Sequence, residues 1–325
     1  MPASLLATSL AGISLRSPVI LAAGTAGTLD EMADVLDLSR VGAVVTKSIT
    51  RLAREGNPTW RILECKVGML NAIGLANVGL DEFEAHIAPR VAGVPTTVIG
   101  SIAGFSIDDY VQVAAAMDNV EAMPAVELNV SCPNVHGGLE FGSDPALLRQ
   151  LVAAVRPALP HTRLFVKLSP VAVASPHGIA DFARAAIDAG AQPAGPNQRP
   201  GADALCIANT MPAMAIDVRT RRPRLANITG GLSGPAIHPI ALKLVYDAYR
   251  LVCRDAGVPI VGIGGVLTWE DAAEFVLAGA TAFEIGTGLF ADPRIPLRVG
   301  RGLEKWVRAQ GAAALGELVG AISAA

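Results

Sequence analysis

The sequence predicts an α/β protein of the (β/α)8 TIM barrel class, a single domain over residues 1–325 with long loop insertions at the C-terminal face of the barrel. Short apolar runs alternate eight times with helical segments, which indicates parallel strands joined by crossover helices. Hydrophobic residues make up 51% of the chain and charged residues 17%, so a large core can be buried. Polar residues gather where the apolar runs end, and that face carries the active site in such barrels.

The predicted strands are short runs rich in Val, Ile, Ala and Leu that end at glycine or polar residues. They cover residues 18–24, 41–48, 96–102, 125–135, 163–169, 204–210, 259–265 and 282–288. Helices are expected over residues 30–38, 81–91, 106–117, 144–159, 177–189, 236–256, 269–278 and 297–310. The Asp144-Pro145 pair marks the start of the fourth helix, because proline is favoured at the first helical position.

The long loops over residues 49–77, 132–144 and 211–234 are all expected at the C-terminal face. The insertion 192–201 joins a helix to the next strand, so it is expected at the opposite end. A doubly wound open sheet is the alternative architecture. It would carry a G-x-G-x-x-G fingerprint after its first strand, and residues 23–27 resemble that pattern only weakly, so the barrel is preferred.

Composition excludes several classes of protein. The net charge of -3 and the pI near 6.0 show no excess of positive charge of the kind that binds nucleic acid. The sequence also has no run of basic residues that would bind an anionic membrane surface. No uninterrupted apolar run reaches the roughly 18 residues of a membrane span, and the N-terminus makes a poor signal peptide. The four cysteines, Cys65, Cys132, Cys206 and Cys253, form no C-x-x-C pair, which argues against a zinc or iron–sulfur site. We therefore expect a cytoplasmic protein without a metal.

The stretch over residues 125–135 joins an apolar strand to a chemically capable tip. Its end reads Ser131-Cys132-Pro133-Asn134, and glycines follow shortly afterwards. A lone cysteine is ordinarily a small buried hydrophobe. Here amides and a proline surround the thiol, which a core residue does not need. We therefore interpret Cys132 as a functional thiol, held by the strand on one side and accessible from the loop on the other.

Glycines and lysines at other strand ends indicate an anionic, phosphorylated ligand. Gly264-Gly265 and Gly286-Thr287 end the last two strands, where barrels often bind phosphate through backbone N–H groups, although tight packing would also use glycine. Lys47 and Lys167 also lie at strand ends, and an unpaired buried ammonium is costly. Each must be salt-bridged or face an anion or an electron-rich ring, and Glu127 could pair with only one of them. Together these groups favour flavin mononucleotide (FMN) with a redox substrate beside it, but composition leaves other phosphorylated ligands open.

Six sequence strings carry a family resemblance, in order over nearly the whole chain. They are Thr46-Lys47-Ser48-Ile49-Thr50, Gly56-Asn57-Pro58-Thr59, Asn71-Ala72-Ile73-Gly74-Leu75, Asn129-Val130-Ser131-Cys132-Pro133-Asn134, Val166-Lys167-Leu168-Ser169-Pro170 and Gly230-Gly231-Leu232-Ser233-Gly234-Pro235. Together they resemble the class 1 dihydroorotate dehydrogenases. The third and sixth strings are most similar to class 1B, the NAD-linked type. Class 2 enzymes have serine in place of the cysteine and an extra N-terminal segment, and this chain has neither.

The resemblance implies oxidation of dihydroorotate to orotate in de novo pyrimidine biosynthesis, with Cys132 as general base and hydride transfer to FMN. It implies FMN contacts from Ala23, Gly24, Lys47, Ser48, Ser101, Asn129, Lys167, Ala208, Gly234, Gly264, Gly265, Gly286 and Thr287. It implies substrate contacts from Lys47, Asn71, Ala72, Ile73, Gly74, Leu75, Asn129, Asn134, Asn209 and Thr210. The chain departs from the family at Ala23, where serine is usual, and at Ser101, where class 1B often has asparagine.

The resemblance also implies partners. A class 1 enzyme is expected to be a homodimer. The chain has no clear dinucleotide fingerprint and its cysteines are dispersed, so class 1B resemblance implies a separate subunit carrying FAD and an iron–sulfur cluster. Three alternatives stay open: a fumarate-linked class 1A enzyme, an enzyme of the dihydropyrimidine dehydrogenase type, and a non-catalytic flavin-binding scaffold.

Overall fold

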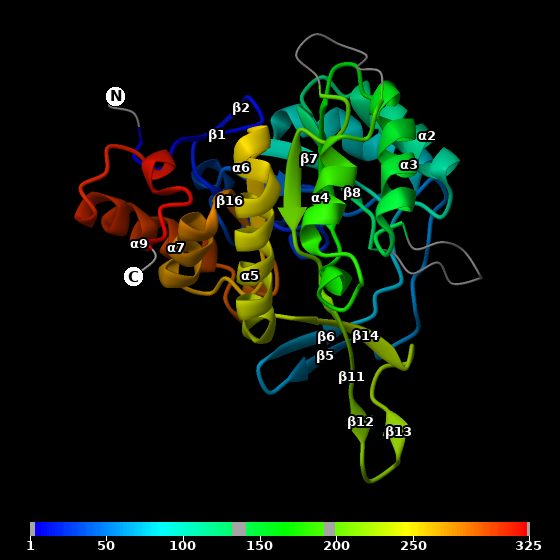
Figure 1. Ribbon diagram of the computed structural model, residues 1–325. Helices are drawn as coiled ribbons and strands as arrows, with labels where there is room; N and C mark the ends of the chain where they lie inside the picture. Colours follow the sequence, from blue (N-terminus) through cyan, green and yellow to red (C-terminus); the bar gives the residue numbers. More distant parts are fainter. Residues whose placement is uncertain (1–3, 132–140, 192–198, 324–325) are drawn as a thin grey trace.

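The computed structural model describes residues 4–131, 141–191 and 199–323 (Figure 1). Its centre is the predicted closed barrel of eight parallel strands, whose neighbours around the barrel follow one another in chain order. The barrel strands are β3 (Val19–Leu21), β4 (Ala43–Val45), β7 (Thr97–Ile102), β8 (Ala125–Asn129), β9 (Arg163–Leu168), β10 (Ala204–Ile207), β15 (Ile260–Ile263) and β16 (Ala280–Ile285). Because every strand runs in the same direction, all eight carboxyl ends lie at one face.

Helices pack around the outside of the barrel, broadly where the sequence predicts them. They are α1 (Leu80–Glu82), α2 (Ile107–Asp118), α3 (Pro145–Val155), α4 (Ile179–Ile187), α5 (His238–Ala248), α6 (Arg254–Ala256), α7 (Trp269–Ala278), α8 (Gly288–Ala291) and α9 (Ile295–Ala309). α1 continues as a π-helical turn (Phe83–Ile87) and a 3-10 turn (Ala88–Gly93), and another π-helical turn (Tyr249–Cys253) joins α5 to α6. Further 3-10 turns cover Arg156–Ala158, Pro170–Val173, Pro235–Ile237 and Leu315–Leu318. As predicted, α3 begins with Pro145 after Asp144, whose side chain accepts hydrogen bonds from the N–H groups of Ala146 and Leu147.

The amino end of the barrel is closed by an apolar plug. β1 (Thr8–Leu10) and β2 (Ile13–Leu15) form an antiparallel hairpin that the sequence analysis did not identify. Leu10 and Leu15 of this hairpin are buried against inward-facing barrel residues such as Ile20 and Phe165. A separate and larger apolar cluster fills the space between the strands and the helices. Among the described residues, the hairpin thus covers the amino end of the barrel, whereas the cavity described below opens at the carboxyl end.

The two longest described loops at the carboxyl face contain strands, which corrects the prediction of irregular loops over 49–77 and 211–234. β5 (Ile62–Cys65), β6 (Gly68–Asn71), β14 (Thr229–Ser233) and β11 (Met211–Met214) form a four-stranded antiparallel sheet. β12 (Ile216–Asp217) and β13 (Arg222–Pro223) form an arm that projects beyond this sheet (Figure 1). Leu232 pairs with Leu70, so the two loops are joined across a long sequence separation that local periodicity cannot reveal.

Some predicted boundaries were wrong. In place of one helix over residues 30–38 the chain forms two 3-10 turns, Glu31–Asp34 and Leu38–Arg40. The Asp37 side chain accepts a hydrogen bond from the Ser39 N–H and so starts the second turn, which prevents a continuous helix. The strands predicted over 41–48 and 125–135 end earlier, at Val45 and Asn129.

Residues 132–140 and 192–198 lie outside the described residues. They include most of the predicted loop 132–144 and most of the insertion 192–201. Among the helices that are described, none is both long and apolar enough to cross a membrane.

Candidate functional site

A cavity of about 550 Å³ lies between the carboxyl ends of the barrel strands and the four-stranded sheet. Its volume is within the range typical of cofactor and substrate sites. It brings together nearly all of the site residues that the sequence predicted: Ala23, Gly24, Lys47, Ser48, Asn71, Ala72, Ile73, Gly74, Leu75, Asn129, Lys167, Ala208, Asn209, Thr210, Gly234, Gly264, Gly265, Gly286 and Thr287. Residues from every part of the barrel thus converge on a single cavity.

Of the predicted site residues that the structure describes, Ser101 alone does not line it. Cys132 and Asn134 lie outside the described residues. Ser101 is fully buried behind the cavity wall, where its Oγ is hydrogen-bonded to the Oγ of Ser48 at 2.8 Å and its N–H donates to Thr46. Ser101 is therefore placed to orient Ser48, which does line the cavity.

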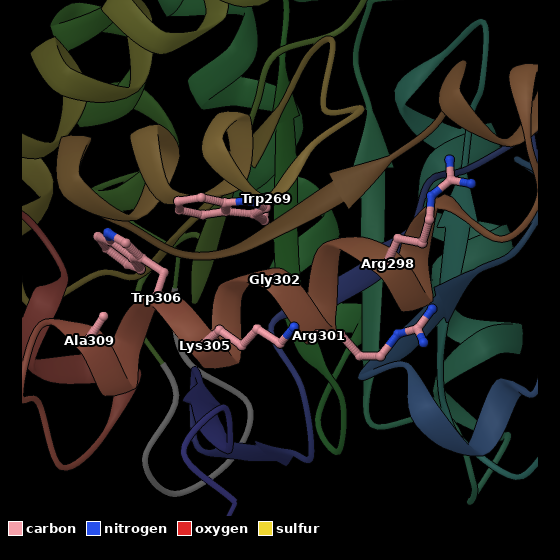
Figure 2. A pocket seen from close by; sticks show the side chains of 7 residues that line it. All are labelled: Trp269, Arg298, Arg301, Gly302, Lys305, Trp306 and Ala309. Atoms are coloured by element: carbon pink, nitrogen blue, oxygen red, sulfur yellow. The ribbon is translucent and has the colours of Figure 1, made fainter.

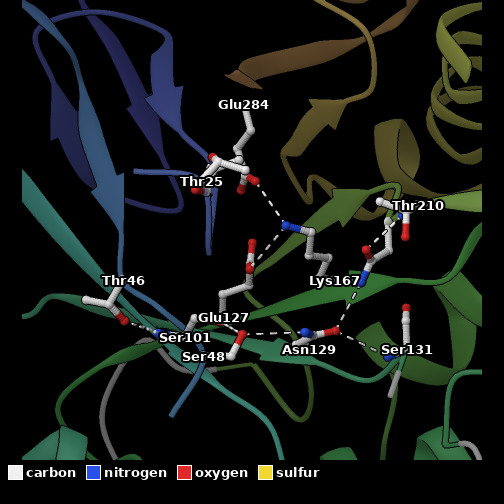
Figure 3. A network of polar contacts seen from close by, with 12 residues as sticks. Thr25, Thr46, Ser48, Ser101, Glu127, Asn129, Ser131, Lys167, Thr210 and Glu284 are labelled. Carbon is white, nitrogen blue, oxygen red and sulfur yellow. Dashed lines mark hydrogen bonds and ion pairs between the residues drawn. The ribbon is translucent and has the colours of Figure 1, made fainter. Parts of the chain in front are cut away.

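A row of hydrogen-bonded amides crosses the cavity between β8 and β10 (Figure 3). The Asn209 Nδ2 donates to the Asn129 Oδ1 at 3.1 Å, and the Asn129 Nδ2 donates to the Ser48 Oγ at 3.4 Å. The Tyr110 hydroxyl donates to the backbone carbonyl of Asn129 at 2.7 Å and so holds the end of β8 in place. Both amide orientations are thereby fixed, as planar polar ligands require.

Ser131 lines the cavity where the described chain stops before Cys132. Its buried Oγ has no hydrogen-bond partner among the described residues. Buried hydroxyls are nearly always paired in folded proteins, so this atom is a candidate ligand contact. Ser131 was not predicted as a site residue from the sequence, although it directly precedes Cys132.

Lys167 forms ion pairs with two buried carboxylates (Figure 3). Its Nζ lies 3.1 Å from Glu284 Oε2 and 3.4 Å from Glu127 Oε1. Burial alone would lower the pKa of Lys167, but the charges of Glu127 and Glu284 outweigh it and raise the pKa above its ordinary value. The predicted pairing of Glu127 with one of the two lysines is confirmed, whereas the contribution of Glu284 was missed.

Lys47 differs from Lys167 because no carboxylate among the described residues forms an ion pair with it. Its side chain is partly buried in the cavity wall beside Gly24. Burial, and to a smaller extent the charge of Arg61, lowers the pKa of Lys47. Both effects disfavour the ammonium in the ligand-free protein, and a bound anion would reverse them. Lys47 is therefore the lysine available to a ligand.

Glycines form a concave backbone surface at the other end of the cavity. Gly234, Gly264 and Gly265 have φ values of +90°, +144° and +71°. A Cβ on Gly265 would lie 2.7 Å from the Gly234 carbonyl oxygen, so only glycine fits there. The Thr287 hydroxyl donates to Ser233 at 2.7 Å beside them. A surface of this kind suits a phosphate group.

His238 supports this glycine surface from behind and was missed by the sequence analysis. Its Nδ1–H donates to the Gly264 carbonyl at 2.7 Å, and its Nε2 lies 2.8 Å from a carboxylate oxygen of Glu274 on α7. The ring also packs edge-on against Phe275. These contacts connect the loop after β15 to α5 and α7, and so fix the backbone that faces the cavity.

Arg54 adds a further cation at the mouth of the cavity. Its guanidinium lies 4.5 Å above the Phe105 ring, and its Nε donates to the Gly74 carbonyl at 3.3 Å. In the sequence, Arg54 stands two residues before the string Gly56-Asn57-Pro58. This position could have marked it as a site residue, but it was not predicted.

A second hollow, of about 520 Å³, lies on the outer surface along α7 and α9 (Figure 2). Trp269 lies flat over Gly302, where a Cβ would come within 2.5 Å of the indole. Trp306 lies beside it, and Arg298 forms an ion pair with Asp292. No strand end lines this hollow. The Ser131 hydroxyl and the Lys47 ammonium, which lack a partner among the described residues, instead face the barrel cavity, which we take as the functional site.

Comparison with known proteins gives consistent matches. The family model described as Dihydroorotate dehydrogenase matches residues 5–307. The chain is 45% identical to "Dihydroorotate dehydrogenase B (NAD(+)), catalytic subunit" of Pelobacter propionicus, over 97% of each chain. It is 40% identical to the protein of that name from Bacteroides fragilis, over 98% of each chain.

Two further matches differ in name or in distance. A protein of Solibacter usitatus with the provisional name dihydroorotate dehydrogenase A (fumarate) is 43% identical over 98% of each chain. The crystal structure of DHODH from Eimeria tenella in complex with ferulenol superposes with a TM-score of 0.79, at 22% identity, over 98% of this chain and 88% of that one. At this identity the superposition shows a common fold.

The unpaired state of Lys47 predicts a stability change in the ligand-free protein. Lys47→Met should raise the free energy of unfolding by roughly 1 kcal/mol, the lower end of the cost of an unsatisfied polar group. The unfolded chain binds this proton more tightly than the native one, so wild type should gain stability as pH rises through the lowered pKa towards 10.5. The variant should lose that rise. Urea unfolding at several pH values measures both effects, with the exposed Lys66→Met as control; destabilisation specific to Lys47→Met would contradict the interpretation.

Proposed function

The chain belongs to the dihydroorotate dehydrogenase family, and from that premise we propose that it is the catalytic subunit of an NAD-linked, class 1B enzyme. The family activity is the oxidation of dihydroorotate to orotate in de novo pyrimidine biosynthesis, catalysed with a flavin. One observation above all supports the finer assignment. The relatives named as NAD-linked catalytic subunits match the chain over nearly its whole length.

We propose FMN as the flavin, because the cavity fits its parts. The glycine surface around Gly234, Gly264 and Gly265 leaves room for a phosphate and would hold it through backbone N–H groups. The ring would lie towards Lys47, Asn129 and Lys167. Ser101 would act through Ser48, and the methyl group of Ala23 would offer the flavin no hydrogen bond. When bound, FMN supplies the acceptor for the hydride that leaves the substrate.

The chain's own residues hold the pyrimidine and move its proton. Asn71, Asn129 and Asn209 present amide donors and acceptors to a planar ring, and Lys47 offers its ammonium to the substrate carboxylate. Cys132 takes the proton from C5 as the hydride leaves C6, so the C5–C6 single bond becomes the double bond of orotate. The covering sheet of β5, β6, β11 and β14 limits the access of water to the site.

The role of Cys132 can be tested by substitution. Cys132→Ala should nearly abolish reduction of the flavin by dihydroorotate while the flavin stays bound, because no base then takes the C5 proton. Cys132→Ser should regain activity only at higher pH, since a hydroxyl is a much weaker acid than a thiol of pKa about 8.5. Anaerobic stopped-flow absorbance measures both rates. Cys253→Ala, a buried helix cysteine, serves as control, and reduction at the wild-type rate in Cys132→Ala would refute the assignment.

We further propose that this chain forms a homodimer and passes electrons to a separate subunit carrying FAD and an iron–sulfur cluster. The relatives are named as catalytic subunits of an NAD-linked enzyme, which supports a separate second subunit. Exposed apolar side chains around the site support a protein partner on this side, among them Trp60, Val67, Met214, Ile216, Val218 and Ile228. Large exposed apolar patches commonly mark interaction surfaces.

The electron-transfer proposal predicts what the isolated chain does with NAD. Dihydroorotate should reduce the flavin, and turnover should then stop unless an artificial acceptor is present, because the electrons have no route to NAD. Absorbance at the flavin and NADH bands measures both steps. Rapid NADH formation by the isolated chain would remove the need for a second subunit.

The same assay separates the alternatives. Sustained turnover with fumarate would support a class 1A enzyme, which the Solibacter usitatus relative makes the strongest rival. Reduction by dihydrouracil in place of dihydroorotate would support the dihydropyrimidine dehydrogenase type. A bound flavin that no pyrimidine reduces would leave only a binding scaffold.

A further inference from the structure

Ionisable side chains are clustered inside the barrel beneath the cavity, and Figure 3 shows Glu127, Lys167 and Glu284 among them. They are Glu127 on β8, Lys167 on β9, Cys206 on β10 and Glu284 on β16, and all four are buried. Side chains along a strand point alternately inward and outward, and the nearest inward-facing neighbours Ala125, Phe165, Ala204 and Ala282 are apolar. The cluster therefore lies between an apolar core below and the cavity above, with little access to water.

The charges in this cluster do not balance if every acid is ionised. Lys167 supplies one positive charge, whereas Glu127 and Glu284 would supply two negative charges. The Cys206 thiol stays neutral because burial raises its pKa well above the ordinary value. Lys47 and Arg54 also line the cavity, and no ion pair joins either of them to Glu127 or Glu284 among the described residues. An uncompensated buried carboxylate is costly, so the cluster must lose one negative charge.

The geometry offers a place for the missing proton. Oxygen atoms of Glu127 and Glu284 lie within 4.8 Å of one another, and each carboxylate has one oxygen beside Lys167 Nζ. Glu127 Oε2 is buried and has no hydrogen-bond partner among the described residues. A proton between the two acids would both satisfy this atom and remove the excess charge. Glu127, Cys206 and Glu284 could also surround a metal ion, but the Lys167 ammonium already supplies a positive charge beside them.

We propose that Glu127 and Glu284 share one proton, so that the cluster is neutral and Lys167 is held beneath the cavity as a permanent ammonium. Its Nζ is fixed by two carboxylates from opposite strands, and it cannot leave to pair with a ligand anion. The consequence for a flavin rests on the proposed function: a fixed cation would face the ring. The sharing of the proton itself does not depend on that function.

The expected behaviour with pH follows from Glu284. Burial, followed by the charge of Glu127, raises the pKa of Glu284 to about 8, and Lys167 only partly offsets these effects. In the unfolded chain this acid titrates near 4.5. Between these two values the native protein holds one more proton than the unfolded chain, so stability falls as pH rises through this window.

Infrared difference spectroscopy of the purified full chain tests the proposal directly. At neutral pH the spectrum of wild type minus Glu284→Gln should contain the carbonyl stretch of one protonated carboxylic acid. Glu127→Gln should also lose this band, because the remaining acid would then ionise and pair with Lys167. The matched control Glu304→Gln, on the surface of α9, should keep it. Absence of the band from wild type, or its persistence in both variants, would overturn the proposal.

A second measurement needs no assumption that both variants fold. The carbonyl band of wild type should disappear as pH is raised through about 8, where Glu284 ionises. If Glu284→Gln folds, its free energy of unfolding should fall less steeply with rising pH than that of wild type. The difference between the two slopes should correspond to at most one bound proton. Equal slopes, or a band that does not titrate, would contradict a shared proton. Neither readout uses dihydroorotate, so failure here is distinct from failure of the proposed activity.

Discussion

A buried ammonium needs a compensating charge. Of the two lysines at the strand ends, Lys167 has carboxylates beside it, whereas Lys47 has none among the described residues. Glu127 and Glu284 compensate Lys167 from inside the barrel. Lys47, three strands away around the same barrel, meets no carboxylate among the described residues. The protein thus keeps one cation as a fixed part of the cavity floor and leaves the second for an anion from outside. The proposed role of Lys47 towards the substrate carboxylate depends on this difference.

The rest of the fold protects that arrangement. The hairpin β1–β2 closes the amino end of the barrel, so the polar cluster around Lys167 is shielded from water on that side. The sheet of β5, β6, β14 and β11 covers the carboxyl end and gives the cavity a roof. His238 and the glycines fix the shape of the far wall. Each of these elements limits the contact of the cavity with water, which strengthens the electrostatic interactions inside it.

The features that were predicted correctly from the sequence are those that local patterns of residues determine. Apolar runs ending in Lys47, Asn129, Lys167 and Asn209 predicted both the barrel and the face on which these residues meet. The covering sheet was not predictable because Leu70 and Leu232 pair across a long loop separation. Glu284 was missed because a single acid inside an apolar strand shows its partner only in three dimensions. Cys132 and Asn134 lie outside the described residues, so their predicted roles stay predictions.

The central claim, that Lys47 is left unpaired for the anion of the ligand, is tested most directly by equilibrium binding of orotate. Isothermal titration of wild type and Lys47→Met, both with flavin bound, compares the two dissociation constants, and Lys66→Met provides the control for loss of a charge. The account predicts that Lys47→Met weakens orotate binding by roughly 2–5 kcal/mol, the range for removing one member of a buried charged pair. An orotate dissociation constant unchanged from wild type would contradict it.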